Sequence, residues 1–318
     1  MSAKHRLFFV TDIHGSDRCF RKFINAAKFY KAQTLILGGD ITGKVMIPIV
    51  NQGNGRWIAD YLGESKEFNK EDKVTEFGKN LAEGGIYTIT VSKSEYEEMQ
   101  AKKERVDKAF SESIRGSLER WLELASVRLK ETGARCYISV GNDDDLVVDE
   151  ILSEVTGNII FCEEKIVNID GHEMISFGTS NRTPWNSPRE ADEPVLKAKL
   201  EEMASRLEKP EKSIFSIHVP PIDSGIDAAP MVDENFKPVM KGGHPVMIAA
   251  GSSAVREVLE KYQPLVGLHG HIHESRGIYK LGRTTCINPG SEYGQGILRG
   301  AIVDIEESKV ADYLLVSG

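Results

Sequence analysis

The stretch PLVGLHGHIH, residues 264–273, joins a short apolar run to three of the chain's eight histidines. The run Pro264–Leu268 predicts a β-strand, and the histidines follow at its end. Side chains at alternate positions of an extended chain point to the same side. His271 and His273 are therefore expected to form a pair of neutral nitrogen donors, which suits a transition metal.

Upstream, four more predicted strands end in polar side chains. These strands cover residues 6–11, 33–37, 136–140 and 213–217, and they are followed by Asp12-Ile13-His14, Gly38-Gly39-Asp40, Gly141-Asn142-Asp143 and His218. In α/β folds, ligands bind beyond the carboxyl ends of the strands. A mixed set of nitrogen and oxygen donors favours Mn, Fe, Zn, Co or Ni over Mg or Ca.

Composition is that of an ordinary globular protein, with 318 residues, 40% of them hydrophobic and 28% charged. The net charge of −8 offers no attraction for nucleic acid or an anionic membrane, so neither is expected as a partner. A small phosphorylated substrate remains compatible with this charge, because a metal site supplies its own positive charge. The N-terminal apolar run is too short for a signal peptide, and the four cysteines lack CxxC spacing. A cytoplasmic location with reduced thiols is expected.

Strands alternate with helices along the chain, which predicts an α/β class. Further helices are expected at 196–207 and 254–261, and further strands at 284–287 and 300–305. We expect one domain over 1–318 with an inserted helical segment at about 44–135. That segment holds a predicted strand at 86–91 and a long amphipathic helix at 94–132, capped by Ser94 and Glu97 and stopped by Gly133. Core packing is the favoured role of this helix, and a homodimer contact or a lid is the alternative.

The five blocks together resemble the calcineurin-like metallophosphoesterase superfamily, whose pattern reads D-x-H, G-D, G-N-[H/D/C], H and G-H-x-H. Each block alone is a weak signal, but five blocks in order, each at a predicted strand end, make a strong one. Asn288-Pro289-Gly290-Ser291 matches a block of the small phosphodiesterases of bacteria and archaea. The second block continues Ile41-Thr42-Gly43-Lys44 and lacks the Asp-Arg pair of protein Ser/Thr phosphatases, so a protein phosphatase is not expected.

The resemblance implies a four-layer α/β/β/α sandwich of two mixed sheets flanked by helices. It also implies two divalent transition metals. Asp12, His14 and His273 would hold the first, Asn142, His218 and His271 the second, and Asp40 would bridge them. A metal-bridging hydroxide would attack phosphorus, and the substrate would be a phosphoester, more readily a diester than a monoester. The alternatives are a non-catalytic scaffold with this fold, a phosphomonoesterase or a nuclease.

One position departs from the family pattern, because Asp143 replaces the usual histidine. An aspartate near two cations is ionised and is a poor general acid. The proton for the leaving group would then come from the neighbourhood of His218 or from water, or else the substrate has a good leaving group. Asp144 and Asp145 are expected in a solvated turn or a helix cap.

Substrate contacts are expected from the loop 181–190 and from the segment after His273. The candidates are Asn181, Arg182, Arg189 and Arg276, and Trp185 could stack on a base. The alternative, which is favoured for this loop, is a surface loop with an Arg189–Glu190 pair and a packed tryptophan. Of the other histidines, His269 is expected to end a buried strand outside the metal site. His5, His172 and His244 are expected at the surface or in loops.

Overall fold

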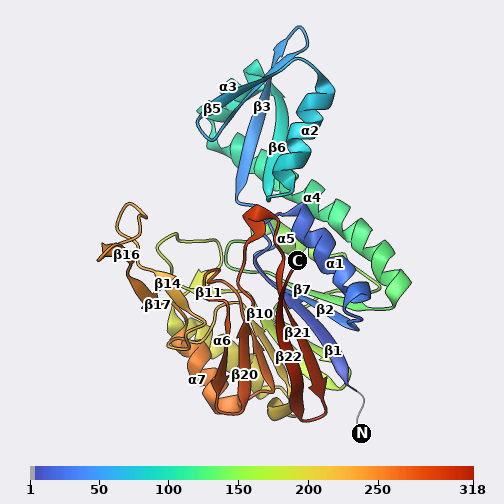
Figure 1. Ribbon diagram of the computed structural model, residues 1–318, viewed down its shortest axis with the longest axis vertical. Helices are drawn as coiled ribbons and strands as arrows, with labels where there is room; N and C mark the ends of the chain where they lie inside the picture. Colours follow the sequence, from blue (N-terminus) through green and yellow to red (C-terminus); the bar gives the residue numbers. More distant parts are fainter. Residues whose placement is uncertain (1–3) are drawn as a thin grey trace.

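The computed structural model describes residues 4–318 as two packed six-stranded sheets with helices outside and a smaller sheet at one end (Figure 1). The first sheet has the order β22-β21-β1-β2-β7-β8. Its strands are β1 (His5–Val10), β2 (Thr34–Gly38), β7 (Arg135–Ser139), β8 (Ile159–Phe161), β21 (Arg299–Glu306) and β22 (Lys309–Ser317). The four strands from β1 to β8 run parallel, and β21 and β22 extend the sheet antiparallel, so this sheet is mixed.

The second sheet has the order β19-β20-β18-β13-β10-β9. Its strands are β9 (Ile166–Ile169), β10 (His172–Phe177), β13 (Ile214–Ile217), β18 (Val266–Leu268), β19 (Gly277–Leu281) and β20 (Thr284–Asn288). The four central strands are parallel, and the edge strands β9 and β19 are antiparallel to their neighbours. The parallel strands of both sheets carry the residues expected at the metal site.

The layers follow from alternation along each strand. In β1, Leu7 and Phe9 face the second sheet, whereas Phe8 and Val10 face the outer helices. The helices α1 (Asp17–Phe29), α4 (Lys103–Thr132) and α5 (Val147–Ser153) cover the first sheet, and α6 (Glu193–Ser205) and α7 (Ser253–Tyr262) cover the second. The predicted four-layer sandwich is confirmed, and its core lies partly between the sheets and partly beneath each helical layer.

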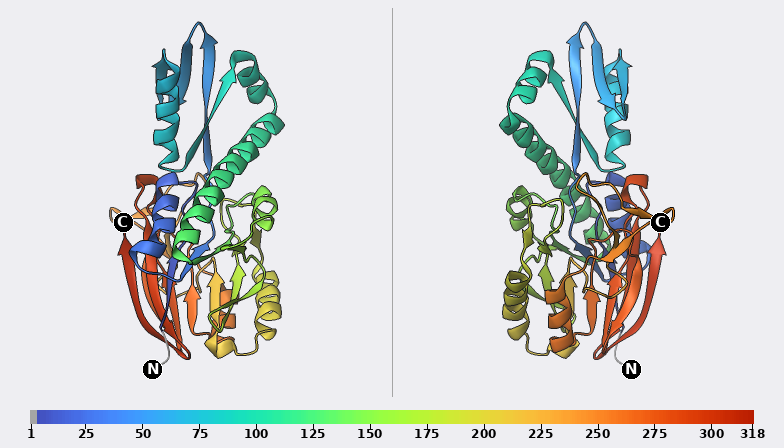
Figure 2. Two further views of the ribbon diagram at one scale, coloured as in Figure 1. Left: turned by 90° about the vertical axis from the view of Figure 1, so that its right-hand side faces the viewer. Right: turned by 90° about the vertical axis from the view of Figure 1, so that its left-hand side faces the viewer.

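Residues 45–92 form a separate small sheet that projects from the sandwich, and we call residues 45–101 the insertion (Figure 2). Its elements are β3 (Val45–Gly53), β4 (Arg56–Tyr61), β5 (Glu64–Phe68), α2 (Glu71–Ala82), β6 (Ile86–Ser92) and α3 (Lys93–Ala101). The predicted strand at 86–91 is confirmed as β6, but the description of this part as helical is wrong, because four strands form its sheet. Ile47, Ile49 and Ala59 pack with α2 in a small core of their own, and the polar edge strand β5 gave no apolar pattern to recognise.

The predicted helix at 94–132 is interrupted. Lys102 is extended and separates α3 from α4, and the capping box is formed by Ser92 and Glu95 rather than by Ser94 and Glu97. The stop at Gly133 is confirmed by its left-handed conformation. The apolar face of α4 from Ile114 to Leu129 is buried on the sandwich, so core packing is confirmed for α4. The homodimer contact and the lid stay predictions.

The base of the insertion is fixed to the loop after β1. The Ser16 hydroxyl caps α1 and also donates to the Glu83 carbonyl at 2.6 Å. Gly85 has φ +87°, and a Cβ there would overlap the carbonyl oxygen of His14. The turn 83–85 therefore needs glycine to pack directly against this loop.

Short elements complete the described chain. They are β11 (Ser180–Asn181), β12 (Glu190–Ala191), β14 (Ala228–Pro230), β15 (Met240–Lys241), β16 (His244–Pro245), β17 (Met247–Ala249), η1 (Pro210–Lys212) and η2 (Tyr293–Gln295). The four cysteines are buried and free. Over residues 4–318, no helix combines the length and the apolar character needed to cross a membrane.

Candidate metal centre

Five loops meet beyond the carboxyl ends of β1, β2, β7, β13 and β18, where the two sheets face each other. They bring together the seven side chains that the sequence singled out, namely Asp12, His14, Asp40, Asn142, His218, His271 and His273. Asp12, His14, Asp40 and His271 all have positive φ, between +37° and +66°. Such backbone strain in non-glycine residues is typical of functional sites.

Four of these residues form one compact group. Asp12, His14, Asp40 and His273 each offer a ligand atom, and these atoms all lie within 4.8 Å of one another. The Nε2 atoms of His14 and His273 are 3.1 Å apart, and Nε2 of His273 lies 3.3 Å from Oδ1 of Asp12. The other three side chains are almost fully buried, and that of His273 is 27% exposed. This group could hold a metal ion.

The remaining three residues lie next to this group, with His218 beside Asp40. Nε2 of His218 is 3.4 Å from Oδ2 of Asp40, and Nδ1 of His271 is 2.7 Å from Oδ1 of Asn142. The rings of His218 and His271 lie edge to face with centroids 5.4 Å apart. Oδ2 of Asp40 is also 3.5 Å from Nε2 of His14, so one carboxylate faces both groups.

The donor set fits a divalent transition metal. His218 uses Nδ1 on the Gly38 carbonyl at 2.9 Å, which leaves its Nε2 buried and without a hydrogen-bond partner. Holding one ring nitrogen of a histidine in this way is how proteins orient a metal ligand. Within each proposed ligand set, the gaps of 3.3–4.0 Å between Nε2 atoms and carboxylate oxygens are long for hydrogen bonds. They suit donors that each lie about 2.0–2.2 Å from a shared cation.

Burial and charge prepare most of these groups for a cation. Burial lowers the pKa of His271 to about 4 and also lowers the pKa of His14, so both rings are neutral donors at pH 7. Burial opposes ionisation of Asp40, but the positive charge of His218 outweighs it and holds the pKa of Asp40 well below its usual range. Ionised carboxylates and neutral imidazoles are the forms that bind metals.

The pKa of His218 shifts in the opposite direction. Burial favours its neutral form, yet the charges of Asp40 and Asp12 outweigh burial and raise its pKa to about 10. In the absence of another cation, a proton on His218 thus compensates the two carboxylates. Metal binding here would release that proton, since the two cations compete for the same buried negative charge.

Asp144 has a role that the sequence did not indicate. It was expected in a solvated turn, but it is fully buried. Its carboxylate accepts hydrogen bonds from the backbone N–H groups of Gly141, Ile41 and Thr42 at 2.8–3.0 Å. It therefore ties the loop carrying Asp40 to the loop carrying Asn142. The prediction was wrong because the donors come from a loop that is distant in sequence.

The Asn288-Pro289-Gly290-Ser291 block supports the other side of the centre. Nδ2 of Asn288 donates to the carbonyls of Gly270 and Ile272 at 3.3 and 3.0 Å, so it braces the turn that carries His271. The Ser291 hydroxyl donates to the carbonyl of Asp12 at 2.6 Å. The block thus holds ligand loops and does not itself add a donor to the cluster.

Asp143 lies beside the centre, and its partners were not predicted. Its carboxylate pairs with Lys44 and accepts from the Ser187 hydroxyl at 2.6 Å. Its backbone N–H donates to Oδ1 of Asp40 at 3.0 Å. The only signal for Lys44 in the sequence was its position four residues after Asp40. Nothing in the sequence connects Ser187 with Asp143.

Of the predicted substrate contacts, Arg189 is already engaged. Its guanidinium donates to the carbonyls of Asp144 and Asp145 and pairs with Asp149, and its side chain is 11% exposed. It therefore fixes the loop after β7, and its guanidinium is not free to bind a phosphate. The expected pair of Arg189 with Glu190 is also wrong, because Glu190 accepts from Thr183 and the Ser187 N–H instead.

The other three candidates stay predictions. Arg182 is exposed and pairs with Asp192 at 2.9 Å, and Arg276 is exposed beyond His273. Oδ1 of Asn181 is buried without a hydrogen-bond partner. Trp185 is exposed rather than packed, and it stacks on Phe236.

The four histidines outside the centre differ in burial. The expected role of His269 is confirmed, because it is buried and its Nδ1 contacts the carbonyls of Ile217 and Val219. His244 is exposed as expected. His172 is buried against the Lys212 carbonyl and His5 is half-buried beside Asp170, so the surface assignment is wrong for His172.

Glu163 is a buried carboxyl group whose protonation can be tested through folding stability. Oε1 of Glu163 accepts from the Gly178 N–H at 2.7 Å, while Oε2 is buried with no partner, and burial raises the pKa to about 8. The unfolded chain loses this proton near pH 4.5, so stability falls as the pH rises from about 4.5 to about 8. The shift corresponds to on the order of 4 kcal/mol at pH 8.

Glu163→Gln keeps the acceptor for Gly178 and removes the ionisation. We expect the variant to gain stability over the wild type at pH 8 and to gain little at pH 5. Urea unfolding of both proteins at the two pH values measures this difference. An equal difference at pH 5 and pH 8 would contradict the assignment of a neutral buried carboxyl.

Comparisons with known proteins support the fold. No family model matches the chain. A 143-residue stretch is 29% identical to MJ1162, an uncharacterised protein of Methanocaldococcus jannaschii, and covers 44% of this chain and 58% of that protein. The chain thus spans less than two thirds of this relative. A crystal structure that is 16% identical superposes over 99% of both chains with a TM-score of 0.57, which shows a shared fold.

Two further structures are more distant. TT1561 of Thermus thermophilus is 12% identical over 99% of both chains, with a TM-score of 0.49. A structure described as a novel archaeal phosphodiesterase is 13% identical over 98% of this chain and 99% of that chain, with a TM-score of 0.35. Scores this low carry no argument about function.

Proposed function

The chain has the fold of the calcineurin-like metallophosphoesterases, and from this premise we propose that it is a metal-dependent hydrolase of phosphodiesters. The observation that carries the proposal is the shared carboxylate of Asp40, whose Oδ2 lies close to Nε2 of both His14 and His218. A carboxylate between two sets of nitrogen and oxygen donors is what a dinuclear site requires.

We assign the first metal to Asp12, His14 and His273 and the second to Asn142, His218 and His271, with Asp40 as the bridge. When bound, two divalent transition metals would activate water and neutralise the charge of the phosphoryl group. The protein orients these ligands through the Gly38 carbonyl, Asp144 and Asn288. The buried surroundings exclude bulk water and strengthen every charge interaction within the site.

Lys44 and Asp143 favour a diester over a monoester. They form an ion pair with no net charge at the edge of the centre. A monoester dianion would need an uncompensated cation there, whereas a diester carries only one negative charge. The charges of Asp40 and Asp143 outweigh burial and raise the pKa of Lys44, so its Nζ stays protonated and can face the oxygen of the leaving group.

Metal titration tests the proposed reaction. Mn, Fe, Co, Ni or Zn is added to metal-free protein, and hydrolysis of bis(p-nitrophenyl) phosphate is compared with hydrolysis of p-nitrophenyl phosphate. We expect metal-dependent turnover that is faster for the diester. Turnover of the monoester alone would favour a phosphomonoesterase, and the absence of turnover with every metal would favour a non-catalytic scaffold.

Replacing Lys44 tests the role of its positive charge. In Lys44→Met the cation next to Asp143 is lost, and we expect kcat/KM for the diester to fall about a hundredfold with unchanged metal content, as when one stabilising group is removed. Kinetics and elemental analysis of the same samples provide the two readouts. Lys66→Met, on the exposed strand β5 of the insertion, is the matched control. A Lys44→Met variant within twofold of the wild type would exclude this role.

A further inference from the structure

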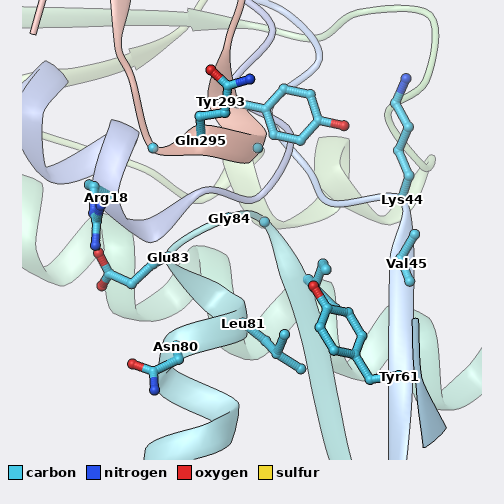
Figure 3. Close-up of a pocket in the computed structure, with 14 residues that line it drawn as sticks. Arg18, Lys44, Val45, Tyr61, Asn80, Leu81, Glu83, Gly84, Tyr293 and Gln295 are labelled. Atoms are coloured by element: carbon cyan, nitrogen blue, oxygen red, sulfur yellow. The ribbon is translucent and has the colours of Figure 1, made fainter. Parts of the chain in front are cut away.

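A cavity of about 420 Å³ lies where the insertion meets the sandwich (Figure 3). Its walls come from the start of β3, the end of α2, the turn 83–85 and η2. The volume falls within the range of small-molecule sites, which is roughly 300–1,000 Å³. No residue assigned to a metal lines this cavity, so it is separate from the ligand cluster.

Two lining residues connect the cavity to the metal centre. The ring of Tyr293 lies 4.6 Å from the ring of His14 and 5.9 Å from that of His273. Lys44 lines the cavity and pairs with Asp143. In Figure 3 the Tyr293 hydroxyl points toward the side of the cavity where Lys44 lies. A group bound in the cavity would therefore lie next to a phosphate bound at the centre.

The cavity walls combine flat apolar surface with neutral polar groups. Tyr61 and Tyr293 provide rings, and Val45 provides an aliphatic surface that is 49% exposed. Asn80 and Gln295 provide amides that can both donate and accept hydrogen bonds. Figure 3 shows Tyr293 and Gln295 on one side of the cavity and Tyr61 and Asn80 on the other.

The charges in the cavity wall are already paired. Arg18 and Arg21 both bind the carboxylate of Glu83, and Lys44 binds Asp143. A strongly charged ligand would find no free partner among these groups. A planar ring with polar edges, such as a nucleobase, matches the rings and amides, because every base offers a face for stacking and an edge for hydrogen bonds.

We propose that this cavity binds a nucleoside-sized aromatic group of the substrate, attached to the phosphate at the metal centre. The inference rests on the proposed function and adds the class of substrate to it. It also gives the insertion a role, since eight of the fourteen lining residues belong to it.

The test uses binding of a nucleoside without phosphate to the full-length, metal-free protein. Adenosine and uridine are the probes, and saturation-transfer NMR measures their affinity. We expect Val45→Trp, which fills the cavity, to weaken binding about tenfold or more, and Tyr61→Ala, which removes one ring, to weaken it about as much. Val127→Trp is the control, because Val127 is similarly exposed on α4 away from the cavity.

A second measurement separates this inference from the proposed function. With metal added, Val45→Trp should raise KM for bis(p-nitrophenyl) phosphate, while inhibition by inorganic phosphate should stay unchanged. If neither nucleoside binds the wild type, or if Val45→Trp and Tyr61→Ala bind as well as Val127→Trp, the cavity proposal is overturned. If nucleosides bind as expected but no metal gives turnover, the proposed hydrolase function fails and the binding site remains.

Discussion

Asp40→Asn is expected to abolish stable binding of both metals and to lower diester hydrolysis at least about a thousandfold. Its carboxylate lies 3.5 Å from Nε2 of His14 and 3.4 Å from Nε2 of His218, so both groups of ligands depend on it. Asparagine retains the shape of the side chain but removes its negative charge. Metal ions contribute several kcal/mol to stabilising a phosphoryl transition state, and each 1.36 kcal/mol is a factor of about ten in rate.

Elemental analysis after dialysis measures the metal content, and steady-state kinetics measures the activity. The control is Asp304→Asn, because Asp304 is also a buried aspartate but pairs with Arg6 on β1, away from the ligand loops. It should keep two metals per chain. Retention of two metals by Asp40→Asn would contradict the bridging assignment.

Asp144→Ala should cause the largest loss of folding stability among these variants. It leaves the buried N–H groups of Gly141, Ile41 and Thr42 without acceptors. Each unpaired buried group costs about 1–3 kcal/mol, so the three groups together are expected to lower the free energy of unfolding by roughly 3–9 kcal/mol. The loops carrying Asp40 and Asn142 also lose their common tie, and metal affinity should fall with stability.

Asp145→Ala is the matched control. Asp145 is next in sequence and its carboxylate accepts only from the Val147 N–H at the start of α5. Its loss should cost about 1 kcal/mol, the typical net contribution of one hydrogen bond. Denaturant unfolding of the two metal-free variants measures both effects. If the two variants lose equal stability, the tie between the loops is not what Asp144 contributes.

The metal ligands could be predicted from the sequence because each ligand follows a strand directly. Asp12 and His14 follow β1, and His271 and His273 follow β18, so a local pattern locates each donor. The meeting of these loops follows from parallel strands, whose carboxyl ends share one edge of a sheet. The packing of two sheets against each other was predicted only from the family resemblance.

The supporting residues could not be predicted in this way, because their partners are distant in sequence. Asp144 binds N–H groups about one hundred residues earlier, and Lys44 pairs with Asp143 over a similar separation. Arg189 carries a guanidinium group that could bind a phosphate, but this group already donates to the carbonyls of Asp144 and Asp145. Within the insertion, β5 could not be recognised because it is polar and lies at an exposed edge, where strands lack apolar alternation. The strand β3 is apolar, but Pro48 within it argues against a strand.

The route of the chain through the insertion also has a consequence for the order of folding. β2 and β7 are neighbours in the first sheet, yet residues 39–134 lie between them, so pairing them closes a long loop at a cost in chain entropy. Inside that loop, β3 and β6 pair in parallel from Val45↔Ile86 to Asn51↔Ser92. An insertion that folds first would bring residues 45 and 86 together and shorten the loop that remains to be closed. The segment that carries the cavity would then also act as a folding aid for the metal centre.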